Sequence, residues 1–221
     1  MSVFTLLGAQ LARLAELLHP LFGASATAAA IVACTLAVRL ALHPLARAAA
    51  RGERARAALA PQIAELRRRH RGDPGRLQRS MLDLHARSGT SPLAGCLPTL
   101  LQLPVFLLMY QVFTRPESGL LDETLFGAAL GGRWTDALDA GGPLGPQGLV
   151  YLALFAVVGA AAAWTALCAR RRMTGAEDRM LRVLPLLSFG TLVTAAVVPL
   201  AAGLYLATTT AWTAAERTLL L

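Results

Sequence analysis

The sequence contains no lysine, and only 15% of its 221 residues are charged, against about 25% in an average soluble domain. Aromatic residues are also scarce, at 6%, whereas 55% of the chain is hydrophobic. This composition excludes a disordered tail, a fibrous repeat and a small disulfide-linked scaffold. The shortage of charge, together with a mean hydropathy of +0.52, indicates a membrane protein.

Cysteine is rare too, and its three copies, Cys34, Cys96 and Cys168, all lie in apolar stretches. An odd number in such surroundings argues against a disulfide framework. The four histidines are dispersed and do not add ligands at the spacing of a metal site. We therefore interpret the cysteines as buried apolar thiols and expect no metal, no cofactor and no catalytic residue.

Long runs with little or no charge are abundant, and a membrane-crossing helix needs about 20 such residues. The longest run, Val183–Ala215, has 33 uncharged residues, which is too many for one ordinary span. Pro199, followed by Leu200–Gly203, predicts a tight reversal between two short helices there. A single tilted helix is the alternative. With the reversal, the sequence predicts five spans: 24–45, 92–114, 148–168, 181–198 and 200–217.

Residues 1–23 are apolar but carry Arg13, Glu16 and His19. A secretory signal would begin with positive charge, and residues 1–12 have none. Gln10, Arg13 and Glu16 follow one another at three-residue spacing and share a helical face. The segment therefore predicts an amphipathic helix that lies in the membrane interface.

The arginines set the predicted orientation. The link 46–91 holds eleven arginines and four acids, and residues 169–182 hold five arginines and two acids, whereas 115–147 holds two arginines and five acids. Arginine-rich links stay in the cytoplasm. The N-terminus is therefore predicted outside and the C-terminus inside, with 115–147 as the extracytoplasmic loop and 169–180 as a short cytoplasmic loop. This distribution leaves little reason to interpret the basic pI as DNA binding.

The cytoplasmic link 46–91 has apolar residues at helical spacing on both sides of Gly72–Gly75. The pattern predicts two amphipathic helices that form an antiparallel hairpin. Four arginines crowd its tip: Arg67, Arg68, Arg69 and Arg71. They are candidates for contact with anionic lipid, ribosomal RNA or acidic protein, and the alternative is a solvated positive face that only sets topology.

Arg39 lies well inside the first predicted span, about 22 Å along the helix from Ala24 at 1.5 Å per residue. His43 follows at i+4 and shares its face. An arginine at membrane depth usually faces a protein interior or a water-filled cavity, and the alternative is that it snorkels to the headgroups. Because the other predicted spans offered no evident acid, we expect Arg39 to lie in a hydrated pocket without an acidic partner.

Three segments resemble the YidC/Oxa/Alb family of membrane protein insertases. The first is TLAVRLALHPLARAAARG, in which an arginine precedes a Leu-Pro-type motif; the second is APQIAELRRRHRGDPGRLQRSMLDLHARSGTSPLAGCLPTLLQLPVFLLMYQVF. The third, looser match comprises Met180–Pro185 and Val198–Tyr205, which are similar to paired short helices around a Pro-x-Gly-Leu turn. The likeness extends from about Ala28 to Arg217, and its most specific part is Pro92–Tyr110.

The resemblance implies an all-α integral membrane protein of the bacterial cytoplasmic membrane, with five spans around a hydrophilic groove. Arg39 would receive the polar, often acidic, part of an incoming membrane protein, whose apolar segment then moves into lipid. No covalent chemistry is implied. The partners implied are nascent membrane proteins, the ribosome, the Sec translocon and anionic lipids. Carried over by position, the groove residues are Arg39, His43, Gln102, Trp164, Thr165, Thr209 and Trp212.

Trp164, Thr165 and the threonines of the last span stand where relatives often carry more polar or amide groups, which reduces the polarity expected of the groove. Two other functions therefore stay open. One is a membrane scaffold that stabilises partner subunits without translocating anything. The other is a small anion channel lined by Arg39, which the absence of a visible inverted repeat disfavours.

Overall fold

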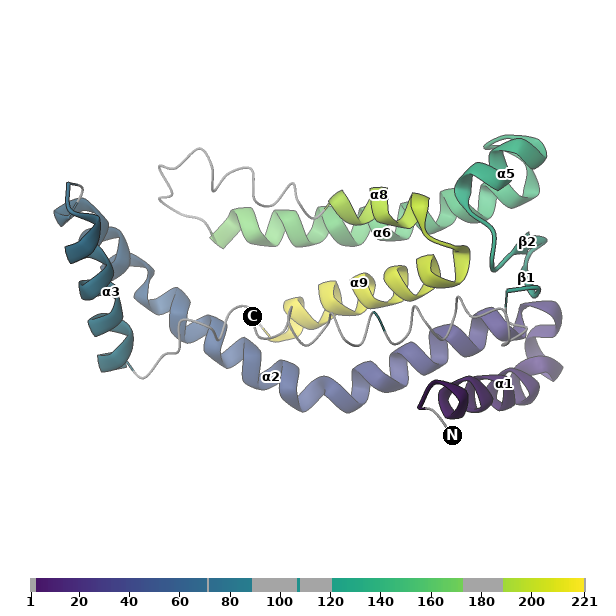
Figure 1. Ribbon diagram of the computed structural model, residues 1–221, viewed down its shortest axis with the longest axis horizontal. Coiled ribbons are helices and arrows are strands. Elements are labelled where there is room, and N and C mark those ends of the chain that lie inside the picture. Colours follow the sequence, from purple (N-terminus) through teal and green to yellow (C-terminus); the bar gives the residue numbers. More distant parts are fainter. Residues whose placement is uncertain (1–2, 71, 89–106, 108–120, 173–188, 221) are drawn as a thin grey trace. The chain divides into compact units, whose positions relative to one another are not determined.

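The protein is almost entirely helical, as Figure 1 shows for the computed structural model. The structure describes residues 3–70, 72–88, 107, 121–172 and 189–220. They form two compact units, whose boundaries fall after Leu40 in one long helix and after Thr218 in the last helix. Of the predicted second span, 92–114, only Leu107 is among the described residues.

The chain begins with helix α1 (Val3–Phe22) and the single 3-10 turn η1 (Gly23–Ser25). Gly23 has a φ of +52°, a left-handed conformation that glycine adopts without a steric penalty, and this ends α1. Leu17 and Leu21 are 75% and 78% exposed. The helix thus keeps apolar surface available for lipid, and its interfacial position stays a prediction.

Helix α2 (Ala26–Arg69) is continuous over 44 residues and includes the predicted first span and the first arm of the predicted hairpin. It passes through Pro44 and Pro61, although a proline inside a helix removes one backbone hydrogen bond. The sequence placed a boundary near residue 45, where charge begins, but a change from apolar to charged residues does not end a helix.

The second unit contains the far part of α2 and helix α3 (Pro74–Ser88). Between them, the amide of Asp73 donates to the carbonyl of His70 at 3.1 Å, and the Asp73 carboxylate accepts from the amide of Arg76 at 3.0 Å. Asp73 therefore caps α3, and Pro74 occupies its first position, where a missing N–H costs nothing. The turn coincides with the break expected at Gly72–Gly75.

The loop between the second and third predicted spans has its own structure. Strands β1 (Thr124–Leu125) and β2 (Ala128–Ala129) pair antiparallel across Phe126 and Gly127, which both have positive φ. Helix α5 (Trp134–Gly141) follows, and it packs on helix α6 (Pro146–Arg172). This hairpin could not be predicted from the sequence, because strands of two residues have no detectable periodicity.

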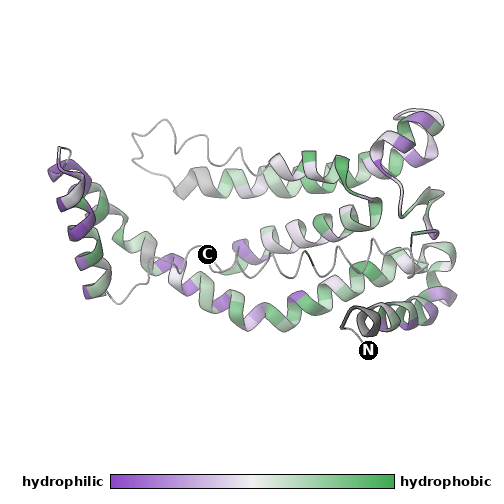
Figure 2. Cartoon of the chain, viewed as in Figure 1, coloured by the Kyte–Doolittle hydropathy of each residue, from purple (hydrophilic) through white to green (hydrophobic). Residues whose placement is uncertain are grey.

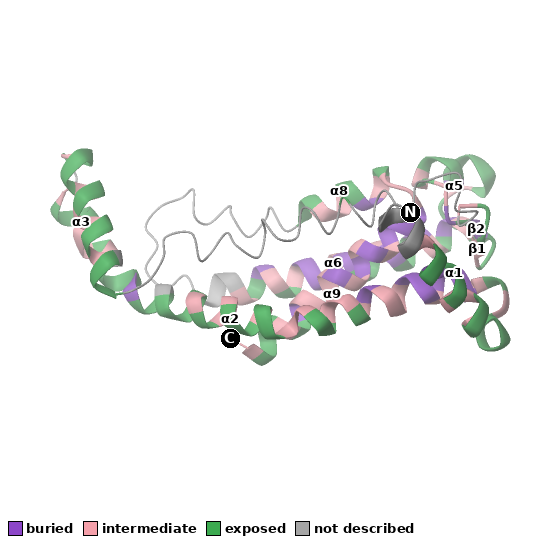
Figure 3. Cartoon of the chain, turned by 60° about the horizontal axis from the view of Figure 1, so that its bottom comes forward, coloured by how far each residue is buried: buried purple, intermediate pink, exposed green. Residues whose placement is uncertain are grey.

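The apolar core of the first unit lies largely on α6 and on helix α9 (Leu200–Leu220), where Figure 3 shows most of the buried positions. The two helices approach closely at Gly203, where an added Cβ would lie 2.8 Å from Cδ2 of Leu154. Helix α8 (Gly190–Val197) also packs on α6.

The 33-residue uncharged run is divided into two helices, because α8 ends at Val197 and α9 begins at Leu200. The break at Pro199 was predicted. The expectation that Leu200–Gly203 forms the reversal was wrong, since these residues are the first turn of α9. Proline is favoured just before or within a first turn, where its missing N–H is not needed.

Within the described residues, two helical stretches are long and apolar enough to cross a membrane: Gly8–Arg69, which includes α2, and Pro146–Cys168 in α6. Figure 2 shows the corresponding hydrophobic residues in the first part of α2 and in α6, and hydrophilic residues along α3. The fourth predicted span is described only from residue 189 onward. Five spans therefore stay a prediction.

Candidate functional site

Arg39 lies on α2 about 20 Å beyond Ala26, the first residue of the helix, at 1.5 Å per residue. Its side chain is half-buried. One turn earlier, Thr35 is 2% exposed and its hydroxyl donates to the carbonyl of Ile31 at 2.7 Å. The Thr35 hydroxyl is thus satisfied within the helix, and Arg39 is the group on this stretch of α2 that can act on another molecule.

A polar stripe runs along α9. Tyr205, Thr209, Trp212 and Glu216 follow one another at spacings of four, three and four residues, which places them on one helical face. We call these four residues the α9 stripe. Tyr205 is 3% and Thr209 is 7% exposed, whereas Trp212 and Glu216 are half-buried.

Two polar atoms of the α9 stripe are buried without a hydrogen-bond partner in the described part of the chain: Oγ1 of Thr209 and Nε1 of Trp212. Other threonines of α9 differ, since the hydroxyl of Thr208 donates to the carbonyl of Leu204 and that of Thr213 to the carbonyl of Thr209, both at 2.8 Å. An unsatisfied buried donor is costly, at about 1–3 kcal/mol, so these two atoms are candidates for contact with a bound molecule.

Tyr205 and Glu216, two members of the α9 stripe, contribute to the electrostatic surroundings of Arg39, but the ion pairs of the described residues do not include Arg39. The expectation that Arg39 lies in a hydrated pocket without an acidic partner stays a prediction. Glu216 directly follows the uncharged run Val183–Ala215 and lies near the end of the predicted span 200–217. Its helical spacing from Thr209 and Trp212 was the signal that could have identified it.

The loop formed by residues 121–133 lies beside the starts of α2 and α9. Strand β1 contacts η1, which directly precedes α2. On the other side, the amides of Leu200 and Ala201 donate to the carbonyls of Gly132 and Leu130, both at 2.9 Å. These bonds satisfy backbone donors of the first turn of α9 that have no partner within the helix.

Both helices therefore start beside the same hairpin. Counted from these starts at 1.5 Å per residue, Arg39 lies about 20 Å along α2, and Trp212 and Glu216 lie about 18 and 24 Å along α9. The arginine and the far end of the α9 stripe thus lie at similar distances along their helices from this loop.

Tyr151 holds the same loop onto α6. Its hydroxyl donates to the carbonyl of Gly132 at 2.5 Å, so this carbonyl accepts from both Tyr151 and the amide of Leu200. The Tyr151 ring is 1% exposed and lies against Trp134 and Phe155, with the Trp134 and Phe155 centroids 5.3 Å apart. Sequence reasoning missed this cluster, because aromatic residues in an apolar helix are not distinctive.

The other predicted groove residues lie in different settings. Thr165 is half-buried on α6 and donates to the carbonyl of Ala161 at 2.8 Å, whereas Trp164 is 46% exposed. His43 follows Arg39 by one turn of α2, beyond the boundary between the units. Gln102 lies outside the described residues. Of the predicted groove residues, Thr209 and Trp212 share the α9 stripe, and Arg39 lies on α2 in the same unit.

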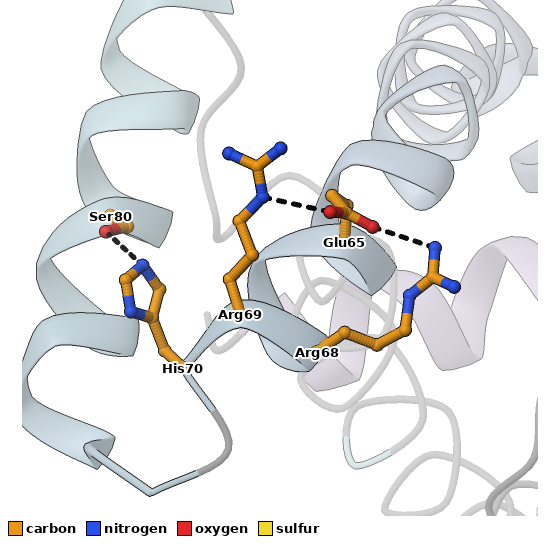
Figure 4. A network of polar contacts seen from close by, with 5 residues as sticks. All are labelled: Glu65, Arg68, Arg69, His70 and Ser80. Carbon is orange, nitrogen blue, oxygen red and sulfur yellow. Dashed lines mark hydrogen bonds and ion pairs between the residues drawn. The ribbon is translucent and has the colours of Figure 1, made fainter.

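At the hairpin tip, Glu65 accepts hydrogen bonds from Arg68 at 2.8 Å and from Arg69 at 2.9 Å (Figure 4). The hydrogen bond from Arg69 and the charge of Arg68 lower the pKa of Glu65 below its ordinary value. Across the turn, Oγ of Ser80 and Nε2 of His70 are 3.5 Å apart. Two of the tip arginines are therefore engaged with Glu65, Arg67 is exposed, and Arg71 lies outside the described residues.

The free cysteines Cys34 and Cys168 are half-buried, as expected for thiols in apolar helices, and Cys96 lies outside the described residues.

The chemistry available at the site is electrostatic and hydrogen bonding. A guanidinium, a carboxylate and two buried donors could hold a polar or charged segment of another molecule, and helices on both sides are apolar.

The family model described as 60Kd inner membrane protein matches residues 17–221. A protein of Campylobacter jejuni named membrane protein insertase YidC is 40% identical over 83 residues, or 38% of this chain and 16% of that protein. One of Granulibacter bethesdensis, with the same name, is 41% identical over 83 residues, or 38% of this chain and 14% of its own length.

A third protein of that name, from Ralstonia nicotianae, is 35% identical over 108 residues, which is 49% of this chain and 19% of that protein. The chain thus matches less than a fifth of the length of each of these relatives. The family model, in contrast, extends over nearly the whole chain, from α1 to the end of α9. The protein therefore belongs to the 60Kd inner membrane protein family, in agreement with the resemblance to YidC/Oxa/Alb insertases in its sequence motifs.

Proposed function

We propose that this protein is a multi-pass insertase and chaperone of the bacterial cytoplasmic membrane. It moves short polar segments of nascent membrane proteins through a hydrated groove that contains Arg39 and releases their apolar helices into lipid. The observation that carries the proposal is a half-buried arginine on a membrane-length helix, beside a stripe with two buried, unpartnered donors.

The energetic problem of insertion is the passage of the polar segment. A charged or hydrogen-bonding group that enters hydrocarbon without a partner costs several kcal/mol. A groove with a cation and two donors offers partners at that depth, so the barrier falls without any covalent step. Burial of the apolar helix of the substrate then makes the transfer favourable as a whole.

The proposed topology has five spans, with the N-terminus outside and the C-terminus inside. The hairpin of α2 and α3 would project into the cytoplasm, where the tip arginines Arg67, Arg68, Arg69 and Arg71 contact anionic lipid, the ribosome or the Sec translocon. With the cytoplasm negative, each carboxylate carried outward gains about 2.3 kcal/mol per 100 mV. The membrane potential thus favours acidic segments.

Reconstitution into liposomes tests the function. The substrate is a single-span protein with a short acidic N-terminal tail, and the measurement is the fraction of tail protected from added protease. We expect Arg39→Ala to lower the initial rate by about tenfold or more, because a hydrogen bond to a charged group contributes about 1.5–3 kcal/mol. Arg47→Ala, an exposed arginine two turns further along α2, is the matched control and should insert like the original protein.

Insertion by the original protein and both variants at one rate would remove Arg39 from the mechanism. If folded protein gave no protection above that of empty liposomes, the insertase function itself would be wrong. The scaffold alternative would then be preferred, and it predicts crosslinks to mature subunits but not to nascent chains on ribosomes.

A further inference from the structure

The tip of the β1–β2 hairpin carries an aromatic side chain on a strained backbone. Phe126 and Gly127 form the two-residue turn between the paired residues Leu125 and Ala128, and their φ angles are +49° and +85°. Such a turn favours Asn-Gly, because a bulky residue in the left-handed region is strained. The Phe126 side chain is also 77% exposed, so contacts within the protein do little to compensate for this strain.

The hairpin lies at the level where α6 enters the membrane. The hydroxyl of Tyr151 donates to the carbonyl of Gly132, shortly after β2. Tyr151 is five residues, or about 7.5 Å, along the 23-residue apolar stretch Pro146–Cys168, whose length of about 34 Å slightly exceeds a hydrocarbon core of about 30 Å. Helical side chains lean toward the N-terminal end of their helix, which brings this hydroxyl back to the edge of the core. Residues 121–133 are therefore held at the boundary between headgroups and acyl chains.

Other apolar side chains are exposed at the same level. Leu21 and Phe22 are exposed at the end of α1, just before α2 begins, and Leu144 is 78% exposed two residues before α6. Strand β1 contacts η1, which directly follows Phe22, so the hairpin lies beside the end of α1 (Figure 1). Three separate segments thus expose apolar groups where the helices α2 and α6 begin. A bilayer surrounds a protein at one level and covers all three, whereas a bound protein would cover one patch.

We propose that Phe126 is a lipid anchor in the outer leaflet, whose ring inserts between the headgroups and the acyl chains. The inference rests on the proposed topology and not on insertase activity. Transfer of the ring out of water is favourable by about as much as the left-handed backbone costs, so the bilayer compensates for the strained turn. Asp122 and Glu123 beside the tip are exposed carboxylates, which disfavour anionic headgroups and favour a neutral, zwitterionic lipid. The loop of residues 121–133 is then held by lipid as well as by Tyr151.

Photocrosslinking tests the contact. The variant Phe126→p-benzoylphenylalanine keeps an aromatic ring at the tip, and it is reconstituted into vesicles of phosphatidylethanolamine and tritium-labelled phosphatidylcholine. The control carries the same probe at Asp139, an exposed residue of α5 in the same extracytoplasmic loop, and shows whether benzophenone seeks lipid by itself. We expect lipid labelling at position 126 to exceed that at 139 about fivefold or more, since even partial burial of such a ring shifts an equilibrium by this factor. Equal labelling, or crosslinks to a second copy of the chain in place of lipid, would overturn the proposal.

A second measurement reports depth and avoids the bulky probe. Phe126→Trp adds one indole to the three tryptophans of the chain, and its emission is obtained as the difference from the original protein. Phosphatidylcholine brominated near the headgroup should quench this added emission more than phosphatidylcholine brominated near the chain end, and the emission added by Asp139→Trp should be quenched by neither. Added emission from position 126 that neither lipid quenches would overturn the proposal. Neither measurement uses a substrate, so the anchor can stand where insertion fails, and the insertase function can stand where the anchor fails.

Discussion

Tyr151→Phe should loosen the loop formed by residues 121–133 without disturbing the rest of the protein. The substitution removes one hydroxyl that donates to the carbonyl of Gly132 at 2.5 Å, and it keeps the ring that lies against Trp134 and Phe155. The Gly132 carbonyl retains its second donor, the amide of Leu200, so no buried acceptor is left unsatisfied. The loss is therefore an ordinary hydrogen bond, worth about 1 kcal/mol.

Hydrogen–deuterium exchange measures this change directly. A loss of about 1 kcal/mol corresponds to roughly fivefold faster exchange, and we expect it in the peptides that contain residues 121–133 and 198–204. Tyr151→Ala also removes a ring that is 1% exposed, and truncation of a buried aromatic typically costs about 3–5 kcal/mol. It should therefore accelerate exchange in the same two peptides by a hundredfold or more, at about 1.4 kcal/mol per factor of ten.

The matched control is Leu152→Ala, because Leu152 is adjacent on α6 but 38% exposed. It should leave exchange in both peptides unchanged. Equal exchange in the original protein and Tyr151→Ala would refute the idea that Tyr151 holds the loop. Faster exchange in 121–133 but not in 198–204 would refute the narrower idea that the loop and the start of α9 open together.

Three further predictions follow from single contacts. Gly203→Ala should lower the free energy of unfolding by about 1–3 kcal/mol, because its Cβ would lie 2.8 Å from Cδ2 of Leu154. Leu154→Ala should then lower the free energy of unfolding less in the Gly203→Ala background than in the original protein, and a double-mutant cycle of unfolding measures this difference. Thr209→Val should leave the free energy of unfolding unchanged or raise it by about 1 kcal/mol, because the hydroxyl that it removes is buried and has no partner in the described part of the chain. The same variant should insert neutral polar tails more slowly, and faster insertion would contradict the binding role. Arg69 and Arg68 lower the pKa of Glu65, so its ionised side chain should stabilise the hairpin fully at pH values above the ordinary glutamate pKa. This stabilisation should be lost as the pH falls through the lowered pKa of Glu65. An NMR titration in which Arg69→Gln does not raise the pKa of Glu65 would contradict the pairing.

The helices were easier to predict than their boundaries. Apolar periodicity identified both arms of the hairpin, and Pro74 with its flanking glycines marked the turn. The sequence did not show that α2 runs unbroken from Ala26 to Arg69, because arginines and alanines are good helix formers and nothing there forces a break. The sequence around Pro44 and Pro61 does not show why α2 continues through them.

The start of α9 shows where local information ends. Pro199 predicted an interruption, but Leu200–Gly203 are helical because the amides of Leu200 and Ala201 find the carbonyls of Gly132 and Leu130, about 70 residues earlier in the chain. A backbone contact of this range leaves no local pattern in one sequence. The depth of Arg39 left two interpretations open, a groove residue and an arginine that snorkels to the headgroups, and its groove role stays a prediction.

In the proposed groove, the same contact would close the end at which α9 begins. The first residues of α9, from Leu200 to Gly203, are at most 1% exposed where their exposure is given, and their amides are used by the loop. Further along, Thr208, Trp212 and Glu216 are half-buried and polar. A polar segment can thus be held beside Arg39, but the sealed first turn and the loop block its way past the start of α9. In the proposed topology this start faces outward, so the segment would enter from the cytoplasm, and its complete passage would require the loop held by Tyr151 to open.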